Sequence, residues 1–65
     1  MKLSYNGTPI VLSEVTTLAA LLNAQAAKPP YAVALNGEFI PRSQLADKTL
    51  QDGDSIEVLS PIQGG

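Results

Sequence analysis

The last four residues, Ile62-Gln63-Gly64-Gly65, present the group that could most readily take part in chemistry, a carboxylate at the end of two glycines. Glycine has no Cβ, so Gly64 and Gly65 form a thin segment that can enter a narrow active site and adopt φ values closed to other residues. Composition alone fits a frayed chain end equally well. The two interpretations are distinguished by the structure that the preceding residues are expected to form.

A turn and a strand lead to that end. Asp52-Gly53-Asp54 is typical of a turn, because glycine accepts positive φ and aspartate hydrogen-bonds to its own backbone. The stretch 55–58 alternates polar and apolar residues, which predicts a half-buried strand with Ile56 and Val58 pointing inward. Leu59 continues the strand as an apolar residue in the polar phase. Ser60-Pro61 ends the strand, since proline supplies no donor to a sheet. Two glycines placed just beyond such a strand favour a functional chain end.

Leu59 and Ile62 are the apolar residues nearest to the glycines. Leu59 lies on the phase of the strand opposite Ile56 and Val58, so we expect it on the open face of the sheet. An exposed apolar pair beside a reactive end indicates a docking patch for a partner. The alternative is that one of the two residues folds back onto the core.

The composition limits the classes of function. The chain has 65 residues, 45% of them hydrophobic, and a net charge of −2 with four basic residues. These values indicate one small globular domain and argue against a nucleic-acid surface or an anionic membrane partner. Cysteine and histidine are absent, which removes disulfides, thiolate sites and the commonest general base and metal ligand.

The same sequence shows no signal for a membrane or for export. No apolar run approaches the ~18 residues that span a bilayer, and Met1-Lys2-Leu3 does not begin like a signal peptide. We therefore expect a cytoplasmic protein.

Two Asn-Gly pairs predict two hairpins. Asn6-Gly7 and Asn36-Gly37 both suit type I′ turns, which require positive φ at the two central positions. Pro9 lacks an N–H, so its strand should lie at a sheet edge, and Pro41 should end the fourth strand. The hairpin strands are expected at 1–5, 8–12, 31–35 and 38–40.

One main helix is expected between the hairpins. Leu18, Leu21 and Leu22, continued by Gln25-Ala26, follow a single helical stripe, and Pro29-Pro30 is expected to end it. Residues that suit the N-cap precede the stripe: Ser13, Thr16 and Thr17. A later helical turn at 42–45 should place Leu45 on the core, and Leu50 should pack under the sheet.

These elements predict an α+β fold of two layers, because a helix between two antiparallel hairpins covers one face of one sheet. The last strand has neighbours on both sides only if it lies between the hairpins and parallel to the first strand. That arrangement is the ubiquitin-like β-grasp, a mixed sheet of four to five strands against one main helix. We expect the domain to span residues 1–61 and a flexible, extended tail to span residues 62–65.

Three segments give the chain a resemblance to a known family. They are residues 34–42 (Ala-Leu-Asn-Gly-Glu-Phe-Ile-Pro-Arg), residues 50–57 (Leu-Gln-Asp-Gly-Asp-Ser-Ile-Glu) and the terminal Gly64-Gly65. In this order, and along nearly the whole length, the chain resembles the ThiS family, the sulfur-carrier proteins of thiamine biosynthesis. Pro61 departs from the family pattern at the base of the tail.

The resemblance implies a carrier without catalytic residues of its own. An E1-like adenylyltransferase of the ThiF type would use ATP to adenylate the Gly65 carboxylate. Sulfur from a cysteine-desulfurase pathway, or from an equivalent donor, would then displace AMP and leave a thiocarboxylate. A thiazole synthase of the ThiG type would take up that sulfur. The chain itself would bind no cofactor and no metal, and the implied partner-binding residues are Leu59, Ile62, Gln63 and Gly64.

Other functions share these features. The small subunit of molybdopterin synthase has the same fold and tail, although the short loops and the segment 36–42 favour the thiamine carrier. Thiocarboxylate carriers for cysteine or methionine synthesis and a ubiquitin-like modifier joined to lysines need the same activated end. A pure interaction module would not use the glycines. The intact mass of the native protein distinguishes a thiocarboxylate from a lysine adduct or an unmodified chain.

Overall fold

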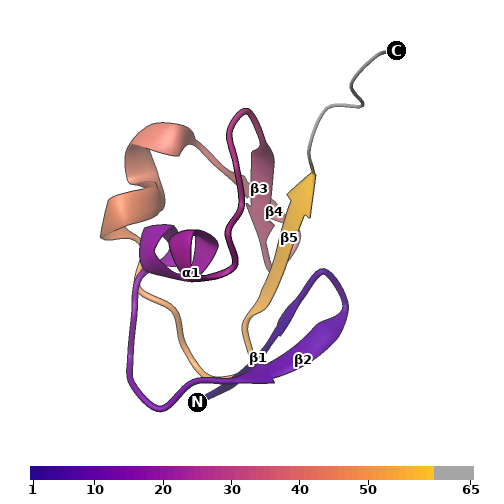
Figure 1. The fold of residues 1–65 in the computed structure, drawn as a ribbon, viewed down its shortest axis with the longest axis vertical. Helices are drawn as coiled ribbons and strands as arrows, with labels where there is room; N and C mark the ends of the chain where they lie inside the picture. Colours follow the sequence, from indigo (N-terminus) through magenta and orange to yellow (C-terminus); the bar gives the residue numbers. More distant parts are fainter. Residues whose placement is uncertain (60–65) are drawn as a thin grey trace.

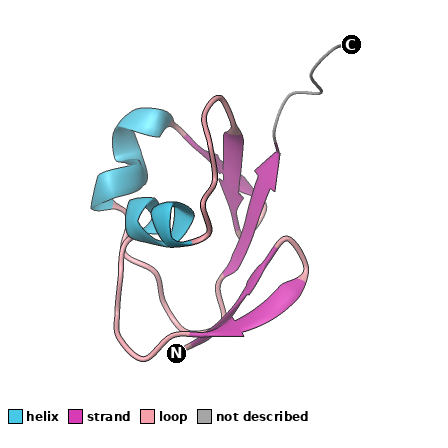
Figure 2. Cartoon of the chain, viewed as in Figure 1, coloured by secondary structure: helices cyan, strands magenta, loops and turns pink. Residues whose placement is uncertain are grey.

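The computed structural model describes residues 1–59 of the chain, and its strands form one five-stranded sheet in the order β2-β1-β5-β3-β4. In this sheet β5 runs parallel to β1 and antiparallel to β3. The helices α1 and η1, the latter a 3-10 helix, lie on the same side of the sheet (Figure 1, Figure 2). This architecture confirms the predicted β-grasp. The elements in chain order are β1 (Lys2–Tyr5), β2 (Thr8–Val11), α1 (Leu18–Ala24), β3 (Ala32–Leu35), β4 (Glu38–Ile40), η1 (Arg42–Asp47) and β5 (Ser55–Leu59).

Both hairpins have the predicted turns. Asn6 and Gly7 have φ angles of 50° and 82°, and Asn36 and Gly37 have φ angles of 53° and 84°. Positive φ at both central positions is the signature of a type I′ turn, which matches the twist of the flanking strands. Pro9 lies in the edge strand β2, as predicted, and Pro41 follows β4 at the other edge.

A single core lies between the sheet and the helices. The leucines of α1 fill its centre, and Leu45 and Leu50 close it from the chain that follows β4, as the sequence predicts. Because these side chains come from every element except β2, the core joins the two hairpins into one domain. Its ten buried residues are Leu3, Leu18, Leu21, Leu22, Val33, Leu35, Ile40, Leu45, Leu50 and Ile56.

The helix begins as predicted but ends earlier than predicted. Thr17 is the N-cap, and its hydroxyl oxygen accepts a hydrogen bond from the Ala20 N–H at 3.2 Å. At the other end, Ala26 takes a φ of 59°. The N–H of Ala26 donates to the Asn23 carbonyl and that of Ala27 to the Leu22 carbonyl, both at 3.0 Å.

These two bonds form a Schellman cap, which ends the helix at Ala24 rather than at Pro29-Pro30. The predicted continuation of the buried stripe through Gln25 and Ala26 is therefore wrong, because both side chains are exposed beyond the cap.

One predicted core residue of β5 is only partly buried. Ile56 is fully buried, whereas Val58 packs against the core but remains half-buried. The cause is the length of β1, which pairs with β5 only as far as Tyr5 opposite Ile56. Beyond that pair, Val58 has a neighbouring strand on one side only, at Val33 of β3.

Candidate functional site

Leu59 is the last residue of β5, and its side chain is 72% exposed. This confirms the prediction that it lies on the open face, opposite in phase to the fully buried Ile56. Leu59 is paired with Ala32 of β3, so the strand is held to its end on that side. The other predicted site residues, Ile62, Gln63, Gly64 and Gly65, lie outside the described residues, and so do Ser60-Pro61 and the predicted domain boundary.

A second large apolar side chain lies on the same open face. Phe39 of β4 is 64% exposed and stands opposite Ala34 of β3. Since Ala32 and Ala34 are small, a shallow groove of about 290 Å³ forms between the larger side chains, with Glu57 at its border. We call Ala32, Ala34, Phe39 and Leu59 the open-face patch.

Phe39 was missed by the sequence analysis, although a signal was present. Pro41 ends β4, and Ile40 fits the core, so the strand alternation directs Phe39 to the other face. Phe39 and Leu59 come from strands on either side of β3, and only the sheet order brings them to one groove.

Two asparagine side chains fasten β5 to the hairpin turns on either side of it. The Val58 N–H donates to Oδ1 of Asn6 at 2.7 Å, and the Ser55 N–H donates to Oδ1 of Asn36 at 2.9 Å. The Asn36 amide also donates to Oδ1 of Asp54 at 3.0 Å. Each end of β5 is therefore tied to a turn that is far from it in the sequence.

The turn before β5 is fixed by two aspartates. Oδ1 of Asp52 accepts from the Lys2 N–H at 2.6 Å, and Oδ2 of Asp54 accepts from the Gln51 N–H at 2.8 Å. Gly53, with a φ of 89°, donates its N–H to the Lys2 carbonyl at 2.6 Å. These aspartates therefore have structural partners within the chain, as the predicted turn requires.

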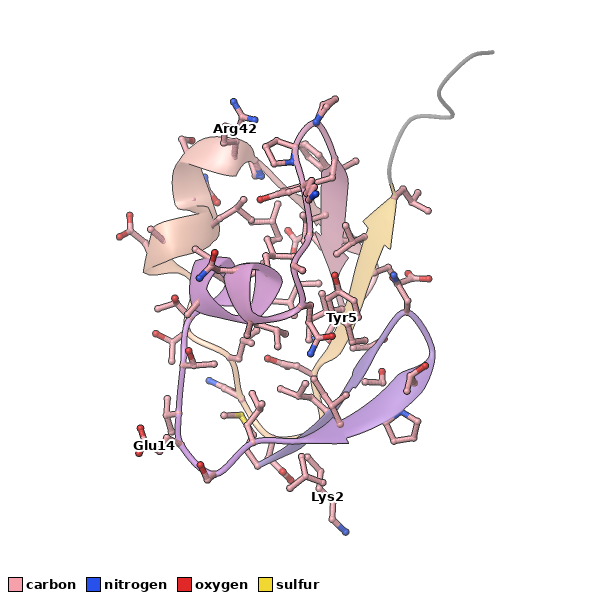
Figure 3. The ribbon with its side chains drawn as sticks, in the orientation of Figure 1. Lys2, Tyr5, Glu14 and Arg42 are labelled. Carbon is pink, nitrogen blue, oxygen red and sulfur yellow. The ribbon has the colours of Figure 1, made fainter. Side chains whose placement is uncertain are left out.

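Among the residues that line the groove of the open-face patch, Glu57 is the one with an ionisable side chain. Arg42 and Glu14 point away from the protein at opposite ends of the helical side (Figure 3). Burial, together with the nearby Tyr31, raises the pKa of Tyr5 above its ordinary value. Among residues 1–59, no group of three or more His, Cys, Asp or Glu side chains is arranged to hold a metal ion. None of the helices in that range has the length and apolar character needed to cross a membrane.

Comparison with known proteins gives a family and similar solved structures. The model of the ThiS family matches residues 3–65. The comparison with curated protein sequences found no match.

Two of the similar solved structures come from Geobacter metallireducens. One is the crystal structure of a thiamine biosynthesis protein (ThiS), which is 33% identical to this chain, with full coverage of both chains and a TM-score of 0.85. The other is the solution structure of a thiamine biosynthesis protein, also 33% identical, with 100% of this chain and 88% of that chain covered and a TM-score of 0.84.

Proposed function

The chain belongs to the ThiS family, and we propose that it is a sulfur carrier of thiamine biosynthesis that acts through the Gly65 carboxylate. The observation that carries this proposal is the extent of the family match, which runs from residue 3 to residue 65 and so includes both terminal glycines. The similarity to a solved thiamine biosynthesis protein over the whole chain supports it.

In the proposed reaction, a carboxylate oxygen of Gly65 attacks the α-phosphorus of ATP on an E1-like, ThiF-type adenylyltransferase, and pyrophosphate leaves. A sulfide equivalent (HS⁻) from the donor system then attacks the carbonyl carbon of the acyl adenylate, AMP leaves, and loss of the proton gives the thiocarboxylate. If the donor presents a persulfide, the acyl disulfide that forms first is cleaved by a second thiol, which becomes part of a disulfide with the donor cysteine. A ThiG-type thiazole synthase takes up the sulfur. A chain without cysteine or histidine suits this division of labour, because the partners supply the catalytic groups.

The open-face patch is the proposed docking surface for the adenylyltransferase. It ends at Leu59, which is the residue from which the terminal six residues continue. A partner that covers Phe39 and Leu59 is therefore bound at the root of the segment it must act on. Aromatic and aliphatic anchors of this kind supply most of the binding energy of an interface.

Deletion of Gly65 tests the carrier role directly. The full chain, the chain without Gly65 and a chain with one added alanine would be compared in an ATP–pyrophosphate exchange assay with the ThiF-type enzyme. Loss of one extended residue withdraws the carboxylate by about 3.3–3.6 Å, whereas a misplacement of about 1 Å can cost roughly 100-fold in rate. Both altered chains should therefore lose exchange.

The melting temperature serves as the control for that experiment. It should not change, because the buried core of the described residues extends only from Leu3 to Ile56. Gly64→Ala is a finer variant, since it adds a Cβ near the end without moving the carboxylate along the chain. If the shortened chain exchanges as fast as the full one, the carboxylate of Gly65 is not the reacting group.

The intact mass of the native protein separates this proposal from the other uses of such an end. Replacement of one oxygen by sulfur supports the carrier. A lysine adduct supports a ubiquitin-like modifier, and an unmodified chain after incubation with the activating enzyme, ATP and a sulfur donor supports an interaction module.

A further inference from the structure

The ladder between β1 and β5 contains one hydrogen bond that a side chain makes in place of the backbone. The Ser4 N–H donates to the Asp54 carbonyl at 2.9 Å, and the Asn6 N–H donates to the Ile56 carbonyl at 2.8 Å. In a parallel ladder, the next bond would run from the Val58 N–H to the main-chain carbonyl of residue 6. Instead, Val58 donates to the side-chain Oδ1 of Asn6 at 2.7 Å.

The turn explains why the side chain is needed. Asn6 has a φ of 50° because it begins the type I′ turn, so β1 ends there while β5 continues to Leu59. The backbone pairing of β1 with β5 stops at Tyr5 opposite Ile56, whereas β3 pairs with β5 as far as Leu59. The Asn6 amide thus adds one more bond on the side where the neighbouring strand has ended.

We propose that Asn6 is a positioning residue for the adenylation of Gly65, an inference that rests on the function proposed above. Its side chain holds Val58 on the side opposite β3 and so fixes the end of β5, to which residues 60–65 are joined. The reacting carboxylate lies six residues beyond Leu59. When the adenylyltransferase holds the segment extended in its active site, a change in the position of Val58 displaces the carboxylate as well, and a misplacement of about 1 Å there can cost roughly 100-fold in rate.

The second hairpin supplies a matched control. Asn36 begins a turn with the same φ pattern, and its Oδ1 accepts from a β5 N–H in the same way, but at Ser55, the end of the strand remote from the chain terminus. Asn6→Gly and Asn36→Gly both keep a residue that accepts positive φ and both remove a side-chain acceptor to β5. Only Asn6→Gly removes an acceptor near the C-terminal end of β5.

The experiment compares these two variants with the wild type and with Asn6→Asp, which keeps both an oxygen acceptor and tolerance of positive φ. ATP–pyrophosphate exchange with the ThiF-type enzyme gives kcat and KM, and hydrogen exchange of the free protein gives the protection of the Val58 amide relative to Ile56. We expect Asn6→Gly to lower kcat about 10-fold or more, with KM for the carrier unchanged because the open-face patch is intact. The Val58 amide should lose protection while Ile56 keeps it.

The remaining variants decide how such a loss is read. Asn6→Asp should restore kcat, and Asn36→Gly should leave kcat at the wild-type value. An equal loss of kcat in both glycine variants, unchanged kcat in Asn6→Gly, or unchanged protection at Val58 would each overturn the inference. Failure of the wild-type chain itself to support exchange would instead overturn the proposed function, so the two failures are distinguishable.

Discussion

Ile56 and Leu59 lie three residues apart on β5 and face opposite sides of the sheet, and their side chains are 0% and 72% exposed. The covered face buries large aliphatic side chains from four of the strands in one core with the buried side chains of α1 and η1. On the open face, Phe39 and Leu59 stand above two alanines with no helix of the described residues over them. One sheet therefore separates two tasks between its faces.

The two faces therefore contribute to different properties, the covered face to stability and the open face to binding. Apolar side chains on the covered face stabilise the fold by leaving water. The same kind of side chain on the open face leaves water only when another molecule covers it, so it contributes to binding and not to folding. Single exposed apolar residues are ordinary, but two that share one groove next to the end of β5 favour a docking surface.

The largest expected effect contrasts the two faces within one strand. Ile56→Ala should reduce the free energy of unfolding by about 2–5 kcal/mol, since it removes a fully buried side chain and leaves a cavity. Leu59→Ala should change it by no more than about 0.5 kcal/mol. A domain of this size has a total stability of roughly 3–10 kcal/mol, so Ile56→Ala would unfold much of the population. Urea denaturation of both variants measures the difference, and similar losses for the two would remove the distinction between the faces.

The next effect concerns binding. Phe39→Lys and Leu59→Lys should each weaken the affinity for the ThiF-type enzyme by about 10–100-fold, or about 1–3 kcal/mol, because each places a charge where an apolar anchor is expected. Isothermal titration calorimetry would measure the change. Val15→Lys is the matched control, since Val15 is equally exposed at 73% but lies in the loop between β2 and α1.

The binding result is interpreted with the Val15→Lys control and with the melting temperature of each variant. Val15→Lys should bind like the wild type, and all three variants should melt at the wild-type temperature. If Leu59→Lys unfolds the protein, its side chain belongs to the core; if Val15→Lys weakens binding as much as the others, the docking surface is not confined to the open face.

The smallest effect is expected from a substitution just after α1, away from both faces of the sheet. Ala26→Gly should raise the free energy of unfolding by about 0.5–1 kcal/mol, because Ala26 has a φ of 59°, a region that costs an alanine more than a glycine. Thermal or urea denaturation would measure the gain, and the affinity for the ThiF-type enzyme should stay the same. A loss of stability would mean that the Schellman cap tolerates alanine without strain.

Much of the fold was predictable because its signals are local. The Asn-Gly pairs dictate type I′ turns through the φ values they accept, and the spacing of Leu18, Leu21 and Leu22 indicates one buried helical face. The exposure of Leu59 followed from the alternation of β5. Each of these features depends on residues that are neighbours along the chain.

The features that were not predicted depend on distant parts of the chain. Alanine is a poor residue for positive φ, so nothing local indicates that Ala26 ends the helix. The joining of Phe39 and Leu59 in one groove depends on β3 lying between their strands. Likewise, Asn6 reaches Val58 only because β5 inserts beside β1, 52 residues along the chain.

Pro9 in β2 and Pro41 just after β4 affect whether copies of the domain can pair through the edges of their sheets at high concentration. The N–H of Leu12 donates inward to the Met1 carbonyl, so by alternation Pro9 and Val11 turn their backbone groups outward from β2. At the edge formed by β4, the residues whose backbone groups point away from the sheet are Phe39 and, just after the strand, Pro41.

At each edge, one of these two outward positions is a proline without an N–H, so a strand from another copy meets a single donor and can form only a weakened ladder. Polymerisation of the domain edge to edge into fibres is therefore disfavoured, even with one face of its sheet uncovered.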